Sequence, residues 1–469
     1  MAVAGARAGR LAVRMAHHDG TSLPGMLAER IDRSVVGGLA ADLGRVVIVV
    51  GTNGKTTTSR LTARILESVD GAAPIANRSG ANLRQGLAST LLAQAASNGH
   101  LRPAGRSAVF EVDELALERV IDDIPPTVLV ILNLFRDQLD RFGEVELVVE
   151  RWRSTLRRLP SSTIIVSCAD DPRVDALAVA SGHRLIRFGL MGDEPGQAPS
   201  NALVTKPGDA PEAALDPISC PVCRSALNTN WRSIGHLGDW ACPLGHVRRS
   251  PPEIAVRAAP AAWPDPTVIT IEGRFGRMTA RIHLAGLAAA YDAGAAVAAA
   301  VALGIEPGTA IAALDGATPA FGRLEEAWIG RRRIVLALVK NPASMTESAE
   351  VAVAMAPDGL LLGLSDEPAD GRDVSWIWDV DLRRLSAVPL IGLTGTRRDD
   401  MGLRLKYSDT PGSPRRAIVA QDGRPGTVLT AMLRAIPVDG TLVVLATYTS
   451  LLAIRSILEQ HGAVPAAPR

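Results

Sequence analysis

The hydrophobic pattern of the chain alternates between short apolar runs and longer stretches that mix apolar and polar residues at helical spacing. Nearly all-apolar strands separated by helices are typical of a parallel sheet that is covered on both faces. The pattern therefore predicts an α/β fold. The predicted strands are Val46–Val50, Ala108–Glu111, Thr127–Leu132, Thr163–Ser167, Ile334–Leu338, Gly359–Leu364, Val388–Gly392 and Thr441–Ala446.

The alternation changes at two places, and these changes predict how the chain divides into domains. Residues 195–265 are rich in proline, contain three of the four cysteines and lack a long helical pattern. The alternation restarts after Glu326, which predicts a separate α/β domain. A chain of 469 residues is also too long for one core. We expect an N-terminal segment over 1–44, a central domain over 45–325 with an insert at about 215–255, and a C-terminal domain over 326–469.

Composition and charge exclude several classes of protein. The chain is 47% hydrophobic and 21% charged, with a formal net charge of +1, so it has no bias toward nucleic acid or an anionic membrane. Arginines interrupt the segment Met1–Met15, which therefore does not resemble a secretory signal. The most apolar window, Leu284–Leu303, contains Tyr291 and Asp292 and predicts a buried amphipathic helix without a membrane span. We expect a soluble cytoplasmic protein.

A glycine-rich turn follows the first predicted strand, with the sequence Gly51-Thr-Asn-Gly-Lys-Thr-Thr57. Glycines let backbone N–H groups converge on phosphate oxygens, and the following helix adds the partial positive charge of its N-terminus. Lys55 is expected to lie exposed on the loop and to reach the β- and γ-phosphates, while the Thr56 hydroxyl contacts Mg²⁺. The alternative, a chance Gly-Lys-Thr turn, does not explain why strand, loop and helix start follow in this order.

The cysteines predict a metal site. Cys220 and Cys223 form a C-x-x-C pair, and Cys242 follows at the spacing of a second knuckle in a structural zinc ribbon. His246 is the expected fourth ligand, with His236 as the alternative. Loss of the metal, with the fold maintained by packing alone, stays open.

The phosphate loop resembles that of the Mur ligases and folylpolyglutamate synthases, which join a carboxylate to an amine through an acyl phosphate. Further similar segments follow in the same order: Phe110–Glu114, Asn133–Gly143, Ala169–Pro172 and Phe321–Glu325. The resemblance implies that Mg²⁺ is held by Thr56 and Glu111. The residues that it implies for ATP binding are Gly51, Thr52, Asn53, Gly54, Lys55, Thr56, Thr57 and Arg323.

The chain also departs from the amino-acid-adding members of the family. Gln138 stands where they have a metal-binding histidine, and Trp152 lies near the place of their carbamylated lysine. The segment Gly286–Asp292 replaces their adenine-side Asn-x-x-Asn pattern. What remains is similar to the MurT branch of the family, including Asn77–Leu83 and the stretch Asp370–Asp381. In that branch a cysteine is expected at the position of Gly245.

This likeness implies a reaction and a partner. MurT-type proteins are the synthetase subunits of lipid II isoglutaminyl synthase, in which ATP, Mg²⁺ and a GatD-like glutaminase serve to amidate the α-carboxylate of D-glutamate. The resemblance implies a catalytic aspartate at Asp379, or secondly Asp381, although the tryptophans around them also fit a packed strand. Cys168 ends a predicted strand and the other cysteines are assigned to metal, so a glutaminase partner is needed for ammonia.

Two alternatives to this activity remain open. An amino-acid-adding ligase of the Mur or folylpolyglutamate type would act alone on an amino acid. A noncatalytic scaffold would bind ATP without turning it over.

Overall fold

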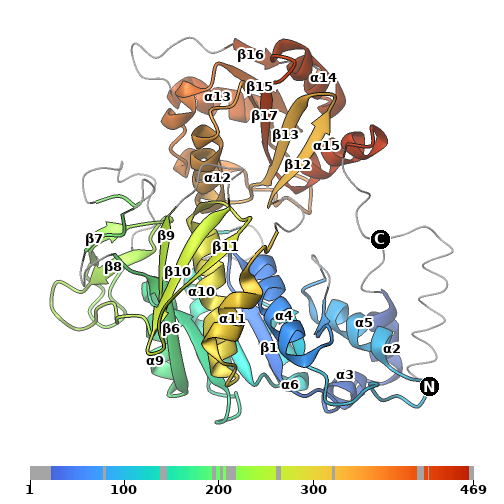
Figure 1. The fold of residues 1–469 in the computed structure, drawn as a ribbon, viewed down its shortest axis with the longest axis vertical. Helices are drawn as coiled ribbons and strands as arrows, with labels where there is room; N and C mark the ends of the chain where they lie inside the picture. The colour runs from blue at the N-terminus through green and yellow to red at the C-terminus, as the bar shows by residue number, and fades with distance from the viewer. Residues whose placement is uncertain are drawn as a thin grey trace.

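The computed structural model describes residues 23–77, 81–137, 145–192, 197–200, 204–206, 218–259, 266–318, 323–408, 417–420 and 422–463. Two large sheets, each flanked by helices, lie one beyond the other along the long axis of the molecule (Figure 1). Parts of the segments named above lie outside the described residues, among them Met1–Met15, Arg78–Gly80, Gln138–Gly143 and Phe321–Gly322. The α/β class with parallel-sheet cores is confirmed.

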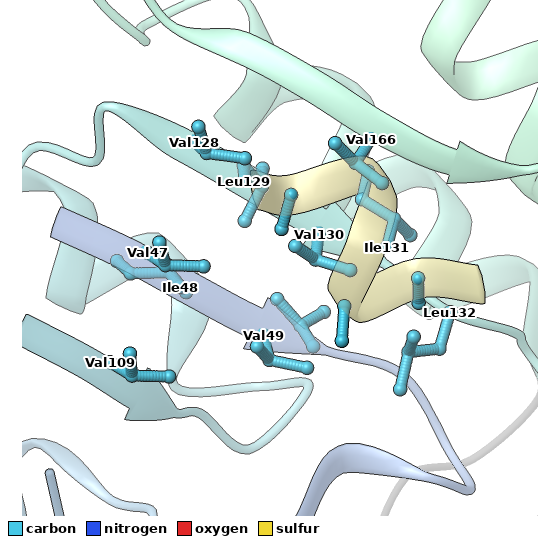
Figure 2. Close-up of a cluster of buried hydrophobic side chains, with 14 of the residues drawn as sticks. Val47, Ile48, Val49, Val109, Val128, Leu129, Val130, Ile131, Leu132 and Val166 are labelled. Carbon is cyan, nitrogen blue, oxygen red and sulfur yellow. The ribbon is translucent and has the colours of Figure 1, made fainter. Parts of the chain in front are cut away.

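The first sheet contains nine strands among the described residues, in the order β11-β10-β9-β6-β5-β4-β1-β3-β2. It is parallel from β2 to β9 and ends in an antiparallel pair of hairpin strands. Buried side chains of β1, such as Val47 and Val49, pack beside those of β3 and β4 in its core (Figure 2). The strands are β1 Val46–Val50, β2 Ile75–Ala76, β3 Ala108–Glu111, β4 Val128–Ile131, β5 Ile164–Cys168, β6 Arg184–Leu190, β9 Ile254–Ala259, β10 Thr267–Gly273 and β11 Gly276–Ile282.

Helices cover both faces of this sheet. They are α2 Leu23–Ile31, α3 Val35–Ala40, α4 Lys55–Asp70, α5 Arg84–Gln94, α6 Leu117–Asp123, α8 Val145–Leu156, α9 Pro172–Ser181, α10 Gly286–Ala302 and α11 Pro307–Leu314. The helix expected over Leu284–Leu303 is α10, but it is not amphipathic: Ala289–Ala300 are all buried. It packs against α4, α11, α12 and the sheet at once, and its alanines allow this close approach. In the described part of the chain, every helix is too short or too polar to cross a bilayer.

The second sheet has six strands among the described residues, in the order β12-β13-β17-β14-β15-β16. Only β12 is antiparallel to its neighbour. The elements are β12 Arg323–Ile329, β13 Arg332–Leu338, α12 Pro342–Ala354, β14 Gly359–Gly363, η2 Ser375–Asp379, η3 Arg383–Ala387, β15 Leu390–Thr394, α13 Arg398–Ser408, β16 Ala417–Ala420, α14 Pro425–Ala435, β17 Thr441–Ala446 and α15 Tyr448–Gln460. The tryptophan-rich stretch forms the short 3₁₀ helix η2, so the packed-strand interpretation is wrong.

A small two-stranded sheet lies between β6 and β9 in the sequence. It consists of β7 Asn228–Arg232 and β8 Gly238–Ala241. Strands β6 and β9 are hydrogen-bonded neighbours in the first sheet. The small sheet is therefore an insertion between two adjacent strands of the first sheet.

Candidate active site and metal centre

The phosphate loop is the turn between β1 and α4. Gly51 and Gly54 have φ angles of 142° and 90°, in the left-handed region that favours glycine. A Cβ on Gly54 would lie 2.2 Å from Oδ1 of Asp292, so this position has no room for a side chain. Gly54 is the N-cap of α4, and no side chain caps that helix end. The first-turn N–H groups of α4 are therefore available to an anion.

The loop is fixed to the end of β4 by Asn133. The side chain of Asn133 accepts a hydrogen bond from the backbone N–H of Asn53 at 2.9 Å and donates to its carbonyl at 3.1 Å. The Thr52 hydroxyl accepts from the backbone N–H of Phe135 at 3.0 Å. These contacts fix the loop to the residues that follow β4.

Lys55 does not lie exposed on the loop as expected, because a carboxylate lies beneath it. Only 7% of Lys55 is exposed, and its ammonium lies 2.9 Å from Oε1 of Glu114 and 2.5 Å from the carbonyl of Gly51. Burial lowers the pKa of Lys55, but Glu114 and Glu111 more than reverse this and raise it above its ordinary value. Burial likewise raises the pKa of Glu114, and Lys55 and Lys340 outweigh it, so that the pKa is lowered overall. Both groups are therefore charged at neutral pH.

Thr56 and Glu111 place two oxygen donors side by side at the end of β3. The Thr56 hydroxyl donates to Oε2 of Glu111 at 2.7 Å. Asn77 holds this strand end by accepting from the backbone N–H of Glu111 and donating to its carbonyl, both at 2.9 Å. Hydroxyl and carboxylate oxygens are hard donors of the kind that Mg²⁺ prefers, so this pair fits the ion.

The second sheet contributes to the same site through the turn between β13 and α12. The Lys340 ammonium lies 3.1 Å from the carbonyl of Thr52 and 2.5 Å from Oδ2 of Asp137. The Asn341 amide donates to Oδ1 of Asn53 at 3.1 Å. Neither Lys340 nor Asn341 was assigned a role from the sequence, and Glu114 and Asp137 were included there only within segments that resemble the family.

A cavity of about 100 Å³ adjoins the loop, between α10 and the second sheet. Its lining includes Asn53 and Gly54 from the loop, Ala289 and Asp292 from α10, and Leu338 and Ser348 from the second sheet. An apolar wall with a few polar groups next to a phosphate loop is suited to a nucleoside. Arg323, expected to bind ATP, is the first residue of β12, and its side chain lies outside the described part of the structure.

The two candidate aspartates differ in their surroundings. Oδ2 of Asp379 lies 3.3 Å from the guanidinium of Arg136, which directly precedes Asp137, and about a third of each side chain is exposed. Asp381 is turned back on its own segment, where both carboxylate oxygens accept hydrogen bonds from Arg383 at 2.8 Å. The structure therefore brings Asp379, and not Asp381, to the segment that supports the phosphate loop.

Three cysteines and one histidine converge beside β8. The ligand atoms of Cys220, Cys223, Cys242 and His246 all lie within 4.8 Å of one another. The sulfurs of Cys223 and Cys242 are 3.6 Å apart, and tetrahedral Zn²⁺ with bonds of about 2.3 Å would separate them by about 3.8 Å. The four donors therefore fit a zinc ion.

Burial raises the pKa of the Cys242 thiol, but the backbone N–H groups of His246 and Leu244 outweigh it and set the pKa at about 7. His236 does not belong to this cluster. It is buried, and its Nε2 lies 3.1 Å from Oδ2 of Asp171.

Three consecutive residues after β5 anchor the cysteine-bearing segment to the first sheet. The carbonyl of Ala169 accepts from the indole of Trp240 at 3.1 Å, and Oδ1 of Asp170 accepts from Arg249 at 2.8 Å. Asp171 contacts His236 and also accepts from the backbone N–H of Leu134 at 2.8 Å. The anchors therefore lead directly to the segment that holds the phosphate loop.

Cys168 is a core residue at the end of β5. Its exposure is 1%, and burial raises the pKa of its thiol well above the ordinary value. A buried neutral thiol does not serve as a nucleophile.

Comparison with known proteins places this geometry in a family. Residues 49–206 match the Mur ligase middle domain and residues 338–451 match the MurT ligase C-terminal domain. The MurT subunit of the glutamine-hydrolysing lipid II isoglutaminyl synthase from Streptococcus pneumoniae R6 is 31% identical over 95% of this chain and 94% of its own length.

Among solved structures, the fold is similar to a type C pseudomurein peptide ligase from Methanothermus fervidus. The TM-score is 0.64 at 18% identity, over 89% of this chain and 79% of that one. MurF from Thermotoga maritima, solved with ADP, has a TM-score of 0.61 at 14% identity, over 91% of this chain and 83% of that one.

Proposed function

Because this chain belongs to the MurT family of lipid II isoglutaminyl synthase subunits, and is thus a ligase that forms carbon–nitrogen bonds, we propose that it amidates the α-carboxylate of D-glutamate in the lipid II stem peptide. This reaction makes D-isoglutamine at the cost of ATP during peptidoglycan synthesis. The observation that supports it most is the phosphate loop with a buried lysine, faced by cationic and amide side chains from the second sheet. The lipid II substrate would be reached at the inner face of the membrane, so we propose that the reaction takes place in the cytoplasm.

The proposed chemistry has two steps. A carboxylate oxygen of the substrate attacks the γ-phosphorus of ATP, and the bond to the β-phosphate oxygen breaks, which releases ADP and leaves an acyl phosphate. Ammonia then attacks the acyl carbon, phosphate departs, and the nitrogen loses a proton to solvent. Lys55 and the N–H groups of the α4 first turn stabilise charge on the transferring phosphoryl group. Mg²⁺, when bound, supplies further charge neutralisation beside Thr56 and Glu111.

We assign ATP contacts to Gly51–Thr57 and to Arg323. The cavity of about 100 Å³ next to Gly54 supports placing the nucleoside between α10 and the second sheet. Trp152 argues against the amino-acid-adding alternative, since its indole is buried and donates to the carbonyl of Glu114 at 2.9 Å. A bulky side chain occupies the region where those ligases are expected to place a carbamylated lysine.

We propose that ammonia comes from a GatD-like glutaminase subunit. With Cys168 buried and the remaining cysteines gathered in one cluster, the chain has no thiol suited to glutamine hydrolysis. A carboxylate close to an acyl phosphate would repel it, so Asp379 is better suited to orienting the histidine of the partner's Cys–His pair. Its partial exposure and its ion pair with Arg136 are compatible with a place at the subunit interface.

The function is tested by assaying the complex with glutamine and, separately, with ammonium at raised pH. Asp379→Asn is expected to abolish the glutamine-driven reaction and to leave the ammonium-driven one, while Asp381→Asn changes neither. Equal loss of both reactions in Asp379→Asn would move this residue into the synthetase site. Glutamine hydrolysis by the chain alone, or ligation of an amino acid without the partner, would contradict the proposal itself.

We also propose that Cys220, Cys223, Cys242 and His246 hold one structural Zn²⁺. Metal analysis of protein purified without chelator should give about one zinc per chain, and Cys220→Ser/Cys223→Ser should lose it. His246→Ala should lose zinc and His236→Ala should keep it. The reverse pattern would show that the fourth ligand is misassigned, and unchanged zinc in the double serine variant would remove the site.

A further inference from the structure

Two lysines from opposite sheets meet at one carbonyl oxygen of the phosphate loop. The ammonium of Lys340 lies 3.1 Å from the Thr52 oxygen, and that of Lys55 lies 3.4 Å from the same atom. The two cations are therefore no further apart than the sum of these distances. Like charges so close repel each other, and they persist together only where anions balance them.

Two carboxylates, Glu114 and Asp137, balance the charges of the two lysines, and the two pairs differ in their exposure. Glu114 is paired with Lys55, and the side chains of both are 9% exposed. Asp137 is paired with Lys340, whose side chain is 30% exposed and therefore more accessible. Oδ1 of Asp137 is buried without a hydrogen-bond partner among the described residues. Lys340 is thus the more accessible of the two cations, and its carboxylate partner is incompletely satisfied.

The sequence supports a special role for these two cations. The chain contains four lysines among 50 basic residues, so nearly all other positive charges are arginines. Two of the four lysines lie at the phosphate loop, and the other two, Lys206 and Lys406, are exposed. An ammonium is a compact charge with three rotatable donors, which suits the end of a phosphate chain better than a planar guanidinium where space is limited.

The backbone presents Lys340 rigidly to the loop. Its N–H donates to the hydroxyl of Ser344 at 3.0 Å, inside the capping box that Asn341 and Ser344 form at the start of α12. Asn341 in turn contacts Asn53 across the gap. Lys340 therefore needs only side-chain rotation to move from Asp137 to a ligand on the loop.

We propose that Lys340 is a second phosphate-contacting lysine, which binds the γ-phosphoryl group of ATP from the side of the second sheet. The inference rests on the proposed ATP-dependent function. Lys55 and the first turn of α4 lie on the first-sheet side of the bound phosphates, so the outermost phosphate is the one that faces Lys340. Charge on the transferring phosphoryl group is spread over three oxygens, and a second cation opposite Lys55 stabilises it.

Calorimetry on the full chain with Mg²⁺ tests this, using ADP and a β,γ-imido analogue of ATP. Lys340→Met is expected to weaken binding of the analogue by about tenfold or more, the worth of a charge-assisted hydrogen bond, and to change ADP affinity by less than about twofold. Lys340→Arg should recover part of the loss. Lys406→Met, which removes an exposed lysine from α13, is the matched control and should bind both nucleotides like the wild type.

Three outcomes would overturn the assignment: equal loss of both nucleotides, unchanged affinity for the analogue, or a similar loss in Lys406→Met. If Lys340→Met fails to fold because Asp137 is left unpaired, Lys340→Met/Asp137→Asn removes both members of the pair and is measured in its place. Wild-type protein that binds neither nucleotide would refute ATP-dependent function as well. If the wild type binds both nucleotides and Lys340→Met lowers the affinity for the ATP analogue no more than that for ADP, only this inference is refuted.

Discussion

The candidate active site is formed by two turns of the same kind that face each other. One joins β1 to α4 and the other joins β13 to α12, so each leads from the carboxyl end of a parallel strand into a helix. In the first turn Gly54 caps the helix without a side chain. In the second, Asn341 and Ser344 form a capping box and Pro342 occupies the first turn. The two turns thus have the same topology, but only the second has a side-chain cap at the start of its helix.

This difference decides what each turn does. A helix end without a side-chain cap leaves N–H groups for an anion, so the first turn is suited to binding. In the second turn the Asn341 side chain accepts from the N–H of Ser344, and the Ser344 hydroxyl accepts from the N–H groups of Lys340 and Asn341, so this turn is fixed and suited to presenting side chains to the first. In this protein the N-cap residue therefore distinguishes a turn suited to binding from a turn suited to presenting side chains.

The largest expected effect comes from removing the cation of the binding turn. Lys55→Ala should reduce ADP formation by about a thousandfold, because a charge that stabilises the transferring phosphoryl group is lost. Since Lys55 is paired with Glu114, the variant should also melt at a lower temperature. Activity is measured below that temperature, with Lys406→Ala as the control. Turnover like the wild type would show that the first turn is not the phosphate site.

Glu114→Gln tests the buried pair from the other side. It should cost about 3 kcal/mol of unfolding free energy at neutral pH, as expected for a buried pair that loses one partner. The folded-state pKa of Glu114 lies below its ordinary value of 4.5, so its contribution to stability is complete above about that pH and is lost as pH falls through the lowered pKa. The difference between wild type and variant, measured by urea unfolding, should therefore shrink below pH 4.5. A constant difference down to pH 3 would contradict the pairing.

Gly54→Ala compares two left-handed glycines at the two ends of α4. The new Cβ would meet Asp292, so we expect a loss of about 2 kcal/mol in stability and most of the nucleotide affinity. Gly71 has a φ of 66° and open space around it, so Gly71→Ala should cost about 1 kcal/mol and leave binding unchanged. Thermal melts and calorimetry on both variants measure this. Equal nucleotide binding by the two would show that the space at Gly54 is unimportant.

Asn341→Ala should have the smallest effect, about 1 kcal/mol of stability, because it removes the cap of the presenting turn. Asn341→Ser restores a capping hydroxyl but cannot span the gap to Asn53. We therefore expect the serine variant to melt like the wild type and still to bind nucleotide more weakly. If serine restores affinity as well, the contact between Asn341 and Asn53 does not contribute to the site.

The sequence predicted the strands whose residues are nearly all apolar and missed strands that contain charged residues, including the interior strands β6 and β9. All eight predicted strands exist, because their apolar residues leave no other assignment. Strands β10 and β11 were missed since Thr267–Gly273 and Gly276–Ile282 mix charged residues into their alternation, as strands near a sheet edge do. The antiparallel strand β12, also at an edge, was missed for the same reason.

The candidate site could likewise be predicted only in part from the sequence. Gly51–Thr57 could be identified because the loop chemistry is local in sequence. Glu114 and Asp137 form ion pairs with Lys55 and Lys340, and these residues belong to segments that come together only after the strands pair. Burial of Lys55 could not be predicted from the loop alone, because it depends on Glu114. The scarcity of lysine was the one sequence signal that could have drawn attention to Lys340.

The anchoring of the cysteine-bearing segment also limits how this protein can be shortened. A segment that leaves and re-enters a sheet between neighbouring strands is ordinarily easy to trim, during evolution or by design, since its ends already lie together. Here Asp170 and Asp171 are fully buried, and their side-chain partners include Arg249 and His236 from the cysteine-bearing segment. A deletion that removes the cysteine-bearing segment would take away Arg249 and His236 and leave the two buried carboxylates with only the hydrogen bonds that Tyr291 and backbone N–H groups donate to them. Loss of this segment would therefore leave two buried carboxylates less well satisfied, which is a stability cost that an ordinary surface insertion does not carry.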